Sequence, residues 1–99
     1  MKRGETHDEH APILVVEDDP DLRRSLIRAL RHDGHRVIEA ADGPTALALT
    51  KSHAPSLVVL DSTMPGMDGE MVLAALKTQP LPPPTVLLAT SRAQQARAT

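Results

Sequence analysis

Three acidic side chains follow two apolar runs of the sequence. Glu17 and Asp18 come directly after Ile13–Val16, and Asp61 comes directly after the run Leu57 to Leu60. If both runs are buried parallel strands of one α/β sheet, their carboxyl ends meet at the same edge, where such sheets bind their ligands. Carboxylates crowded there repel one another and favour a hard divalent cation, which takes oxygen ligands and leaves positions open for phosphate. The pattern predicts a Mg²⁺-dependent site that accepts a phosphoryl group.

The elements that must position these acids alternate along the chain. Strands are predicted at 13–16, 36–40, 57–60 and 85–89. Between them, a first helix is predicted from about Pro20 to His32, a second opens at Asp42-Gly43-Pro44 and continues to about His53, and a third is capped by Asp68. Strands that alternate with helices predict an α/β fold with a doubly wound parallel sheet and right-handed crossovers.

Helical spacing of apolar residues predicts which face of each helix is buried. The predicted inward residues are Leu22, Leu26, Ala29 and Leu30 in the first helix, Ala46, Leu47 and Leu49 in the second, and Met71, Val72, Ala75 and Leu76 in the third. Asp19 precedes Pro20 and is expected to cap the first helix. The first helix is expected to stop at Gly34, and the second at Ala54-Pro55.

The composition of the 99 residues excludes several classes of function. Cys is absent, which excludes disulfides, thiol nucleophiles and cysteine metal sites. Phe, Tyr and Trp are absent too, so the core must be aliphatic and no aromatic platform can stack on nucleic-acid bases. A net charge of −2 gives no electrostatic footprint for DNA or RNA. Four arginines are interpreted as the solvated face of the first helix, with partner docking as the alternative: Arg23, Arg24, Arg28 and Arg31.

The chain is expected to contain one domain, at 12–99, after a disordered polar leader at 1–11. No apolar run approaches the length of a membrane span, and the leader lacks the apolar region of a signal peptide. A cytoplasmic protein is therefore expected. The five histidines lack the clustered spacing of metal ligands, so no histidine metal site is predicted.

Three segments together resemble the receiver domain of two-component response regulators. They are ILVVEDDP at 13–20, LVVLDSTMPGMDG at 57–69 and VLLATS at 86–91. The Asp-x-x-Met-Pro-x-Met-Asp-Gly loop that begins at Asp61 is the most specific of them. The resemblance runs from about Ile13 to Ser91 and implies a flavodoxin-like sheet, in which the four predicted strands have the order 2-1-3-4.

The resemblance also implies a role for each site residue. Asp61 matches the phosphoacceptor, which takes a phosphoryl group from a sensor histidine kinase, a phosphotransfer protein or a small donor. Asp18 matches a direct Mg²⁺ ligand, Glu17 a second acidic contact through water, and Thr63 a ligand through its backbone carbonyl. Thr90 matches the hydroxyl residue that hydrogen-bonds the acyl phosphate and couples it to movement of the next loop. The receiver itself is not expected to be an enzyme beyond its own phosphotransfer and dephosphorylation.

The family pattern continues beyond these 99 residues with a fifth strand and a fifth helix, and with a Lys and an aromatic switch residue that are missing here. Two functions therefore stay open, a phosphorylatable receiver and a degenerate receiver that acts as a phosphorylation-independent interaction module. An aspartate-based phosphatase is a distant third, because Thr63 stands where such enzymes have a second acid. An uncovered fourth strand would expose apolar residues at a sheet edge, so a homo-oligomer or a completing partner chain is also expected.

Overall fold

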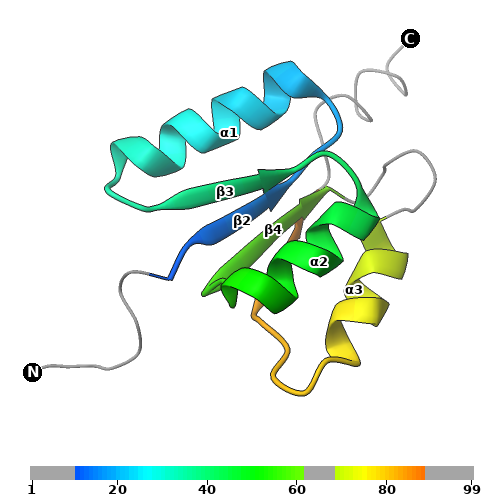
Figure 1. Ribbon diagram of the computed structural model, residues 1–99. Helices are drawn as coiled ribbons and strands as arrows, with labels where there is room; N and C mark the ends of the chain where they lie inside the picture. Colours follow the sequence, from blue (N-terminus) through cyan, green and yellow to red (C-terminus); the bar gives the residue numbers. More distant parts are fainter. Residues whose placement is uncertain (1–10, 62–68, 89–99) are drawn as a thin grey trace, which may run out of the picture.

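The computed structural model of the protein describes residues 11–61 and 69–88 (Figure 1). The strands are β2 (Ile13–Val16), β3 (Val37–Ala40), β4 (Leu57–Asp61) and β5 (Thr85–Leu88). The helices are α1 (Pro20–His32), α2 (Gly43–His53) and α3 (Gly69–Lys77). Several predictions lie outside the described residues, namely those for the leader at 1–10, Thr63, the Asp68 cap, Ala89 and Thr90.

The four strands form one parallel sheet in the order β3-β2-β4-β5. This is the 2-1-3-4 order of the flavodoxin-like fold, so the predicted fold class is confirmed. α1 covers one face of the sheet, and α2 and α3 cover the other (Figure 1). All four residues of β2 are buried, because β2 is a central strand with helices on both faces.

Alternation along the strands divides the core between the two faces. Leu14, Val16, Val58 and Leu60 belong to the cluster that packs against α2 and α3, which contribute Ala46, Val72 and Leu76. Val15 and Val37 belong to the second cluster, which packs against Ile27 of α1. The core is therefore built from aliphatic side chains on both faces, as the absence of aromatic residues requires.

The predicted boundaries of α1 and α2 are confirmed by the geometry of their caps. Asp19 accepts a hydrogen bond from the Asp21 N–H at 3.0 Å, and Asp42 accepts one from the Thr45 N–H at 2.8 Å. The Thr45 hydrogen bonds hold the pKa of Asp42 below its ordinary value. α1 is followed by Gly34 with φ 91°, and Ala54 ends α2 in the left-handed conformation with φ 44°. Gly adopts that conformation at little cost, whereas Ala does not.

Two strand boundaries differ from the prediction. β3 begins at Val37 and not at Arg36, although the Arg36 carbonyl still accepts a hydrogen bond from the Ile13 N–H at 2.8 Å. β4 extends one residue further than predicted and includes Asp61, which pairs with Leu88 of β5. Asp61 is thus the last residue of a strand, and its backbone is fixed by the sheet.

The buried face of α1 is rotated relative to the prediction. Ile27, which was not predicted to face inward, is the buried residue of this helix at 6% exposure, whereas Ala29 is exposed. Leu26 and Leu30 are half-buried beside it. On α3, Met71 was predicted to face inward and is 56% exposed, because the helix packs through Val72 and Leu76. In both helices the direction of the neighbouring sheet determines which residues of the apolar stripe are buried.

Candidate functional site

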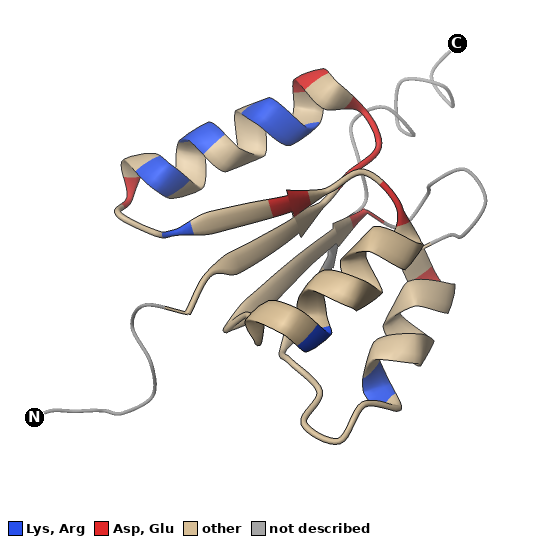
Figure 2. Ribbon diagram, in the orientation of Figure 1, with Lys and Arg blue, Asp and Glu red and all other residues tan. Residues whose placement is uncertain are grey.

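The sheet register brings the three predicted acids together. Val16 of β2 pairs with Leu60 of β4, so the residues that follow each of them, Glu17 and Asp61, lie side by side at the carboxyl edge. The Glu17 N–H donates to the Ala40 carbonyl at 3.1 Å, which continues the ladder to β3 one residue beyond β2. Ligand oxygens of Glu17, Asp18 and Asp61 all lie within 4.8 Å of one another. Acidic residues gather at this end of the sheet (Figure 2).

Burial makes this cluster electrostatically costly. Glu17 is 0% exposed and Asp61 is 1% exposed, while Asp18 is half-buried. The pKa of Glu17 is raised from 4.5 to about 7, chiefly by burial and also by hydrogen bonding with Asp18 and Asp61 and by the charge of Asp61. A hydrogen bond from the Asp19 N–H to Glu17 Oε2, at 3.0 Å, opposes this rise. The site therefore holds negative charge at the expense of stability and would be relieved by a cation.

The hydrogen bonds of Asp19 tie the loop between β2 and α1 to the start of the helix. Asp19 donates its N–H to Glu17 and accepts the Asp21 N–H on its own carboxylate. Its carbonyl accepts the first helical hydrogen bond, from the Arg23 N–H at 2.9 Å. The carboxylate of Glu17 is thereby tied to the start of α1, where unpaired backbone N–H groups favour negative charge.

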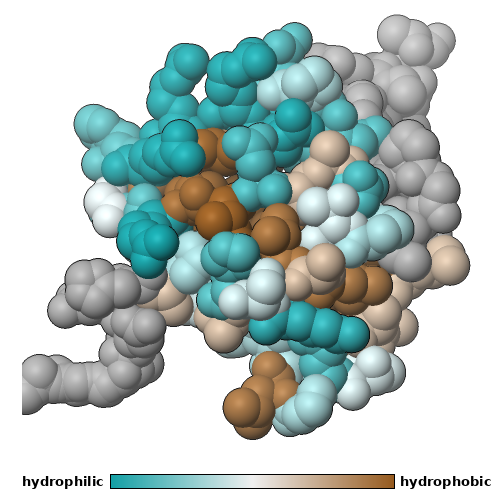
Figure 3. Space-filling view, in the orientation of Figure 1, coloured by the Kyte–Doolittle hydropathy of each residue, from teal (hydrophilic) through white to brown (hydrophobic). Residues whose placement is uncertain are grey.

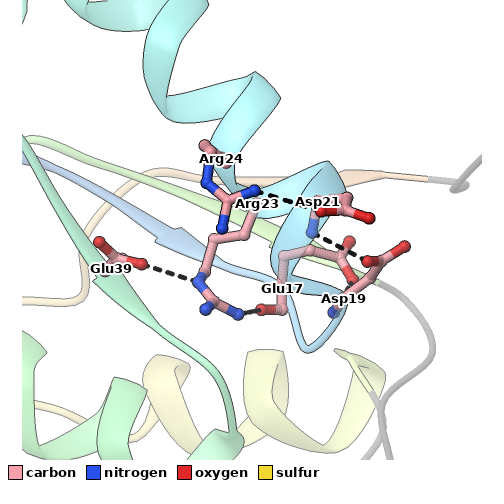
Figure 4. Close-up of polar contacts among 6 residues, drawn as sticks. All are labelled: Glu17, Asp19, Asp21, Arg23, Arg24 and Glu39. Atoms are coloured by element: carbon pink, nitrogen blue, oxygen red, sulfur yellow. Dashed lines mark hydrogen bonds and ion pairs between the residues drawn. The ribbon is translucent and has the colours of Figure 1, made fainter.

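Arg23 connects this loop to β3, although the sequence pattern predicts only a solvated or partner-docking face for it (Figure 4). Its Nη1 donates to the Glu17 carbonyl oxygen at 2.8 Å, and its Nε donates to Glu39 Oε1 at 2.7 Å. The Arg23 side chain is only 19% exposed. Its assignment to a solvated face was therefore wrong, because the rotation that buries Ile27 also brings Arg23, four residues earlier, down onto the sheet.

The other arginines of α1 fit the prediction of a solvated face. Arg24 pairs with Asp21 across one helical turn at 3.2 Å, and the two side chains are 64% and 90% exposed. Arg28 and Arg31 are exposed as well. Hydrophilic side chains cover α1 in the space-filling view (Figure 3).

The donor set fits a hard divalent cation. Carboxylate oxygens are the ligands that Mg²⁺ prefers, and Mg²⁺ uses one or two of them while it keeps several waters. Within residues 11–61 and 69–88, these three acids are the one group of three or more acidic, His or Cys side chains close enough to share an ion. Thr63 and Thr90, the remaining predicted site residues, lie outside the described part of the chain.

Over residues 11–61 and 69–88, no helix combines the length and apolar character needed to cross a lipid bilayer.

Comparison with known sequences identifies relatives among regulators of transcription. The probable transcriptional regulatory protein NarL of Mycobacterium tuberculosis is 42% identical over 82 residues, which cover 81% of this chain and 38% of the relative. The transcriptional regulatory protein TcrA of the same species is 45% identical over 76 residues, covering 77% of this chain and 30% of the relative. The chain thus spans less than two fifths of the length of these relatives.

Comparison with solved structures gives the same result. The signal receiver domain of the putative response regulator NarL from Mycobacterium tuberculosis has a TM-score of 0.72 and 37% identity, covering 92% of this chain and 78% of that one. The response regulator TrrA from Thermotoga maritima, in complex with Mg²⁺ and BeF, has a TM-score of 0.75 and 33% identity, covering 85% and 74%. The family profile described as "Response regulator receiver domain" matches residues 13–99. The chain therefore belongs to the receiver domain family of two-component response regulators.

Proposed function

We propose that this cytoplasmic receiver accepts a phosphoryl group on Asp61 from a sensor histidine kinase or a phosphotransfer protein. The observation that supports this most directly is the position of Asp61. It is the last residue of a central strand, it is 1% exposed, and it shares a 4.8 Å cluster with two further carboxylates. Two acidic neighbours raise the free energy of a buried, ionised Asp, so a purely structural Asp would be less stable beside them.

Glu17, Asp18 and Asp61 would hold Mg²⁺, with Asp18 as a direct ligand, Glu17 in contact through water and the Thr63 carbonyl as a further oxygen ligand. When bound, the ion supplies positive charge that offsets the repulsion between a carboxylate and an anionic phosphoryl group. The related Thermotoga structure contains Mg²⁺ together with BeF, which supports this assignment.

In the proposed transfer, a carboxylate oxygen of Asp61 attacks the phosphorus atom of the donor. A bond forms between that oxygen and phosphorus, while the bond from phosphorus to the donor nitrogen of a phosphohistidine breaks and its electron pair stays on the imidazole. With acetyl phosphate, the acetate oxygen leaves instead. Thr90 would donate its hydroxyl to the acyl phosphate. Hydrolysis by water would return the carboxylate and inorganic phosphate, so the chain acts as a phosphoacceptor and not as an enzyme on other substrates.

No structural observation favours the phosphorylation-independent alternative. Its motivation is that the 99 residues lack the Lys that the family pattern places near the phosphoryl group. Lys51 and Lys77, the lysines in the described part of the chain, belong to the last turns of α2 and α3. Both helices begin near the carboxyl edge of the sheet, so these last turns lie toward its opposite edge. We therefore expect phosphotransfer to be slow, since no described lysine contributes to it.

The proposal is tested by incubating the 99-residue chain with acetyl phosphate and Mg²⁺ and measuring its intact mass. We expect the mass to increase by one phosphoryl group, the adduct to be lost in mild base as an acyl phosphate, and EDTA to prevent its formation. Asp61→Asn should abolish the adduct. Asp21→Asn, which removes an exposed acid of α1, should leave it unchanged. A folded wild-type chain that forms no such adduct would favour the degenerate receiver.

A further inference from the structure

The backbone N–H and the backbone carbonyl of Glu17 both make hydrogen bonds that connect them to β3. Its N–H donates directly to the Ala40 carbonyl at 3.1 Å. Its carbonyl accepts from Arg23 at 2.8 Å, and Arg23 is itself held by Glu39 of β3 at 2.7 Å. The N–H of Glu17 is therefore fixed by the sheet, and its carbonyl is fixed by the Arg23–Glu39 pair (Figure 4).

We propose that Arg23 is a positioning residue of the acidic site, which with Glu39 fixes the Glu17 backbone so that Glu17 and Asp18 present their oxygens toward Asp61. The inference rests on the proposed function, since it assigns Arg23 a role in binding the divalent cation. Arg23 does not belong to the cation site itself. It acts through the backbone of a residue that does.

The chemistry of the guanidinium suits this task better than that of an ammonium. Its planar fork donates through Nε to Glu39 and through Nη1 to Glu17, so the two contacts fix one geometry. A Lys ammonium is a single point donor on a flexible stem and cannot reproduce the fork. The burial of Ile27 on the same face of α1 holds the helix against the sheet and restricts the positions that the Arg23 guanidinium can reach.

The charges of the Arg23–Glu39 pair are consistent with a cation site nearby. The guanidinium contacts the carbonyl of Glu17 and not its carboxylate, so it does not compete for the oxygens that would hold the ion. Glu39 offers an opposite charge at 2.7 Å, which offsets the positive charge that Arg23 would otherwise direct at an approaching cation. Arg23 can therefore order the site without a large electrostatic penalty on cation binding.

A different explanation is that Arg23 and Glu39 form only a surface ion pair, which would contribute little and would not affect the site. The two explanations differ in what Arg23→Lys does to Mg²⁺ binding. Residues that support metal ligands from outside typically change the affinity about 10-fold to 100-fold when replaced. A peripheral ion pair would leave the affinity unchanged.

The experiment measures the dissociation constant of Mg²⁺ by calorimetry, on metal-free wild type, Arg23→Lys, Glu39→Gln and Arg24→Lys. Arg24 is the matched control, because it too pairs with an acid, Asp21, but its side chain is 64% exposed and hydrogen-bonds Asp21 rather than Glu17. We expect the dissociation constant to rise about 10-fold in Arg23→Lys, to rise less in Glu39→Gln, and to stay the same in Arg24→Lys.

The amide signal of Asp19 provides a second readout, since this N–H donates to Glu17 Oε2 at 3.0 Å. In ¹H–¹⁵N spectra, Arg23→Lys should shift this signal and speed its hydrogen exchange, whereas Arg24→Lys should not. If Arg23→Lys binds Mg²⁺ as tightly as the wild type, the positioning role is wrong while the proposed site stands. If the wild type itself binds no Mg²⁺, the proposed site fails. Should Arg23→Lys not fold, Glu39→Gln decides the question, and an unchanged affinity there overturns the inference.

Discussion

Replacing Glu17 with Gln should stabilise the metal-free protein at alkaline pH, although it removes an acid from the proposed site. Glu17 is fully buried, and its pKa is raised to about 7. A Gln amide resembles the protonated acid in shape and charge. Its oxygen can still accept the Asp19 N–H, and its NH₂ can donate to the carboxylates of Asp18 and Asp61. The variant should therefore keep the contacts of the protonated site without the cost of a buried charge.

The sign and size of the effect follow from the pKa of Glu17. Between pH 4.5 and about 7 the folded wild type binds a proton that the unfolded chain has released. The contribution of Glu17 to the free energy of unfolding is thus fully present below pH 4.5 and is lost as the pH rises through about 7. The loss amounts to about 3 kcal/mol, at ~1.4 kcal/mol per pH unit. That is a large fraction of the ~5–15 kcal/mol by which domains are usually stable.

Urea denaturation in EDTA at several pH values between 5 and 8 measures this difference. Far-UV circular dichroism is the suitable probe, because the chain has no Trp or Tyr to give fluorescence. The two proteins should be similarly stable near pH 5, and Glu17→Gln should be more stable by up to about 3 kcal/mol at pH 8. Glu70→Gln, at an exposed Glu of α3, is the control and should follow the wild type. Parallel pH profiles for wild type and Glu17→Gln would refute the reasoning.

Three further predictions follow from the site and the fold. Mg²⁺ should raise the thermal midpoint of the wild type in proportion to occupancy, and Asp18→Ala should lose most of this increase; equal shifts would mean that the ion binds elsewhere. Ile27→Ala should cost about 2–5 kcal/mol in urea denaturation, and more than Leu26→Ala, whereas the reverse order would contradict the rotated face of α1. Ala54→Gly should raise the free energy of unfolding by about 1 kcal/mol by relieving the left-handed conformation, and a loss of stability would show that Ala54 carries no such strain.

The parts of the fold that depend on local sequence were predictable. The Asp19-Pro20 and Asp42-Gly43-Pro44 signals predict helix starts because capping is a short-range interaction, and both starts are confirmed. The grouping of Glu17, Asp18 and Asp61 was predictable because parallel strands align their carboxyl ends, and the structure confirms that the three acids meet. Their individual roles in metal binding and phosphoryl transfer stay predictions.

The parts that depend on how α1 is laid across the sheet were not predictable. Leu22, Leu26 and Leu30 form an apolar stripe in the sequence, yet Ile27 is the residue buried beneath the helix. The contact of Arg23 with Glu39 joins residues sixteen apart on different elements, and no local pattern specifies it. One signal was available, namely that Arg23 stands four residues before Ile27 and shares its side of the helix. It becomes informative only when the buried side is known.

The central place of β2 in the sheet has a consequence for how the protein is made. β2 is the earliest of the described strands along the chain, but both of its neighbours, β3 and β4, come later. A nascent chain that leaves the ribosome therefore carries Ile13–Val16 unpaired on one side until β4 has emerged. Glu17 and Asp18 likewise wait for Asp61 before they can share an ion. If translation pauses before Asp61 emerges, the nascent chain exposes an apolar strand and two of the three acids of the site, a state that favours chaperone binding or aggregation.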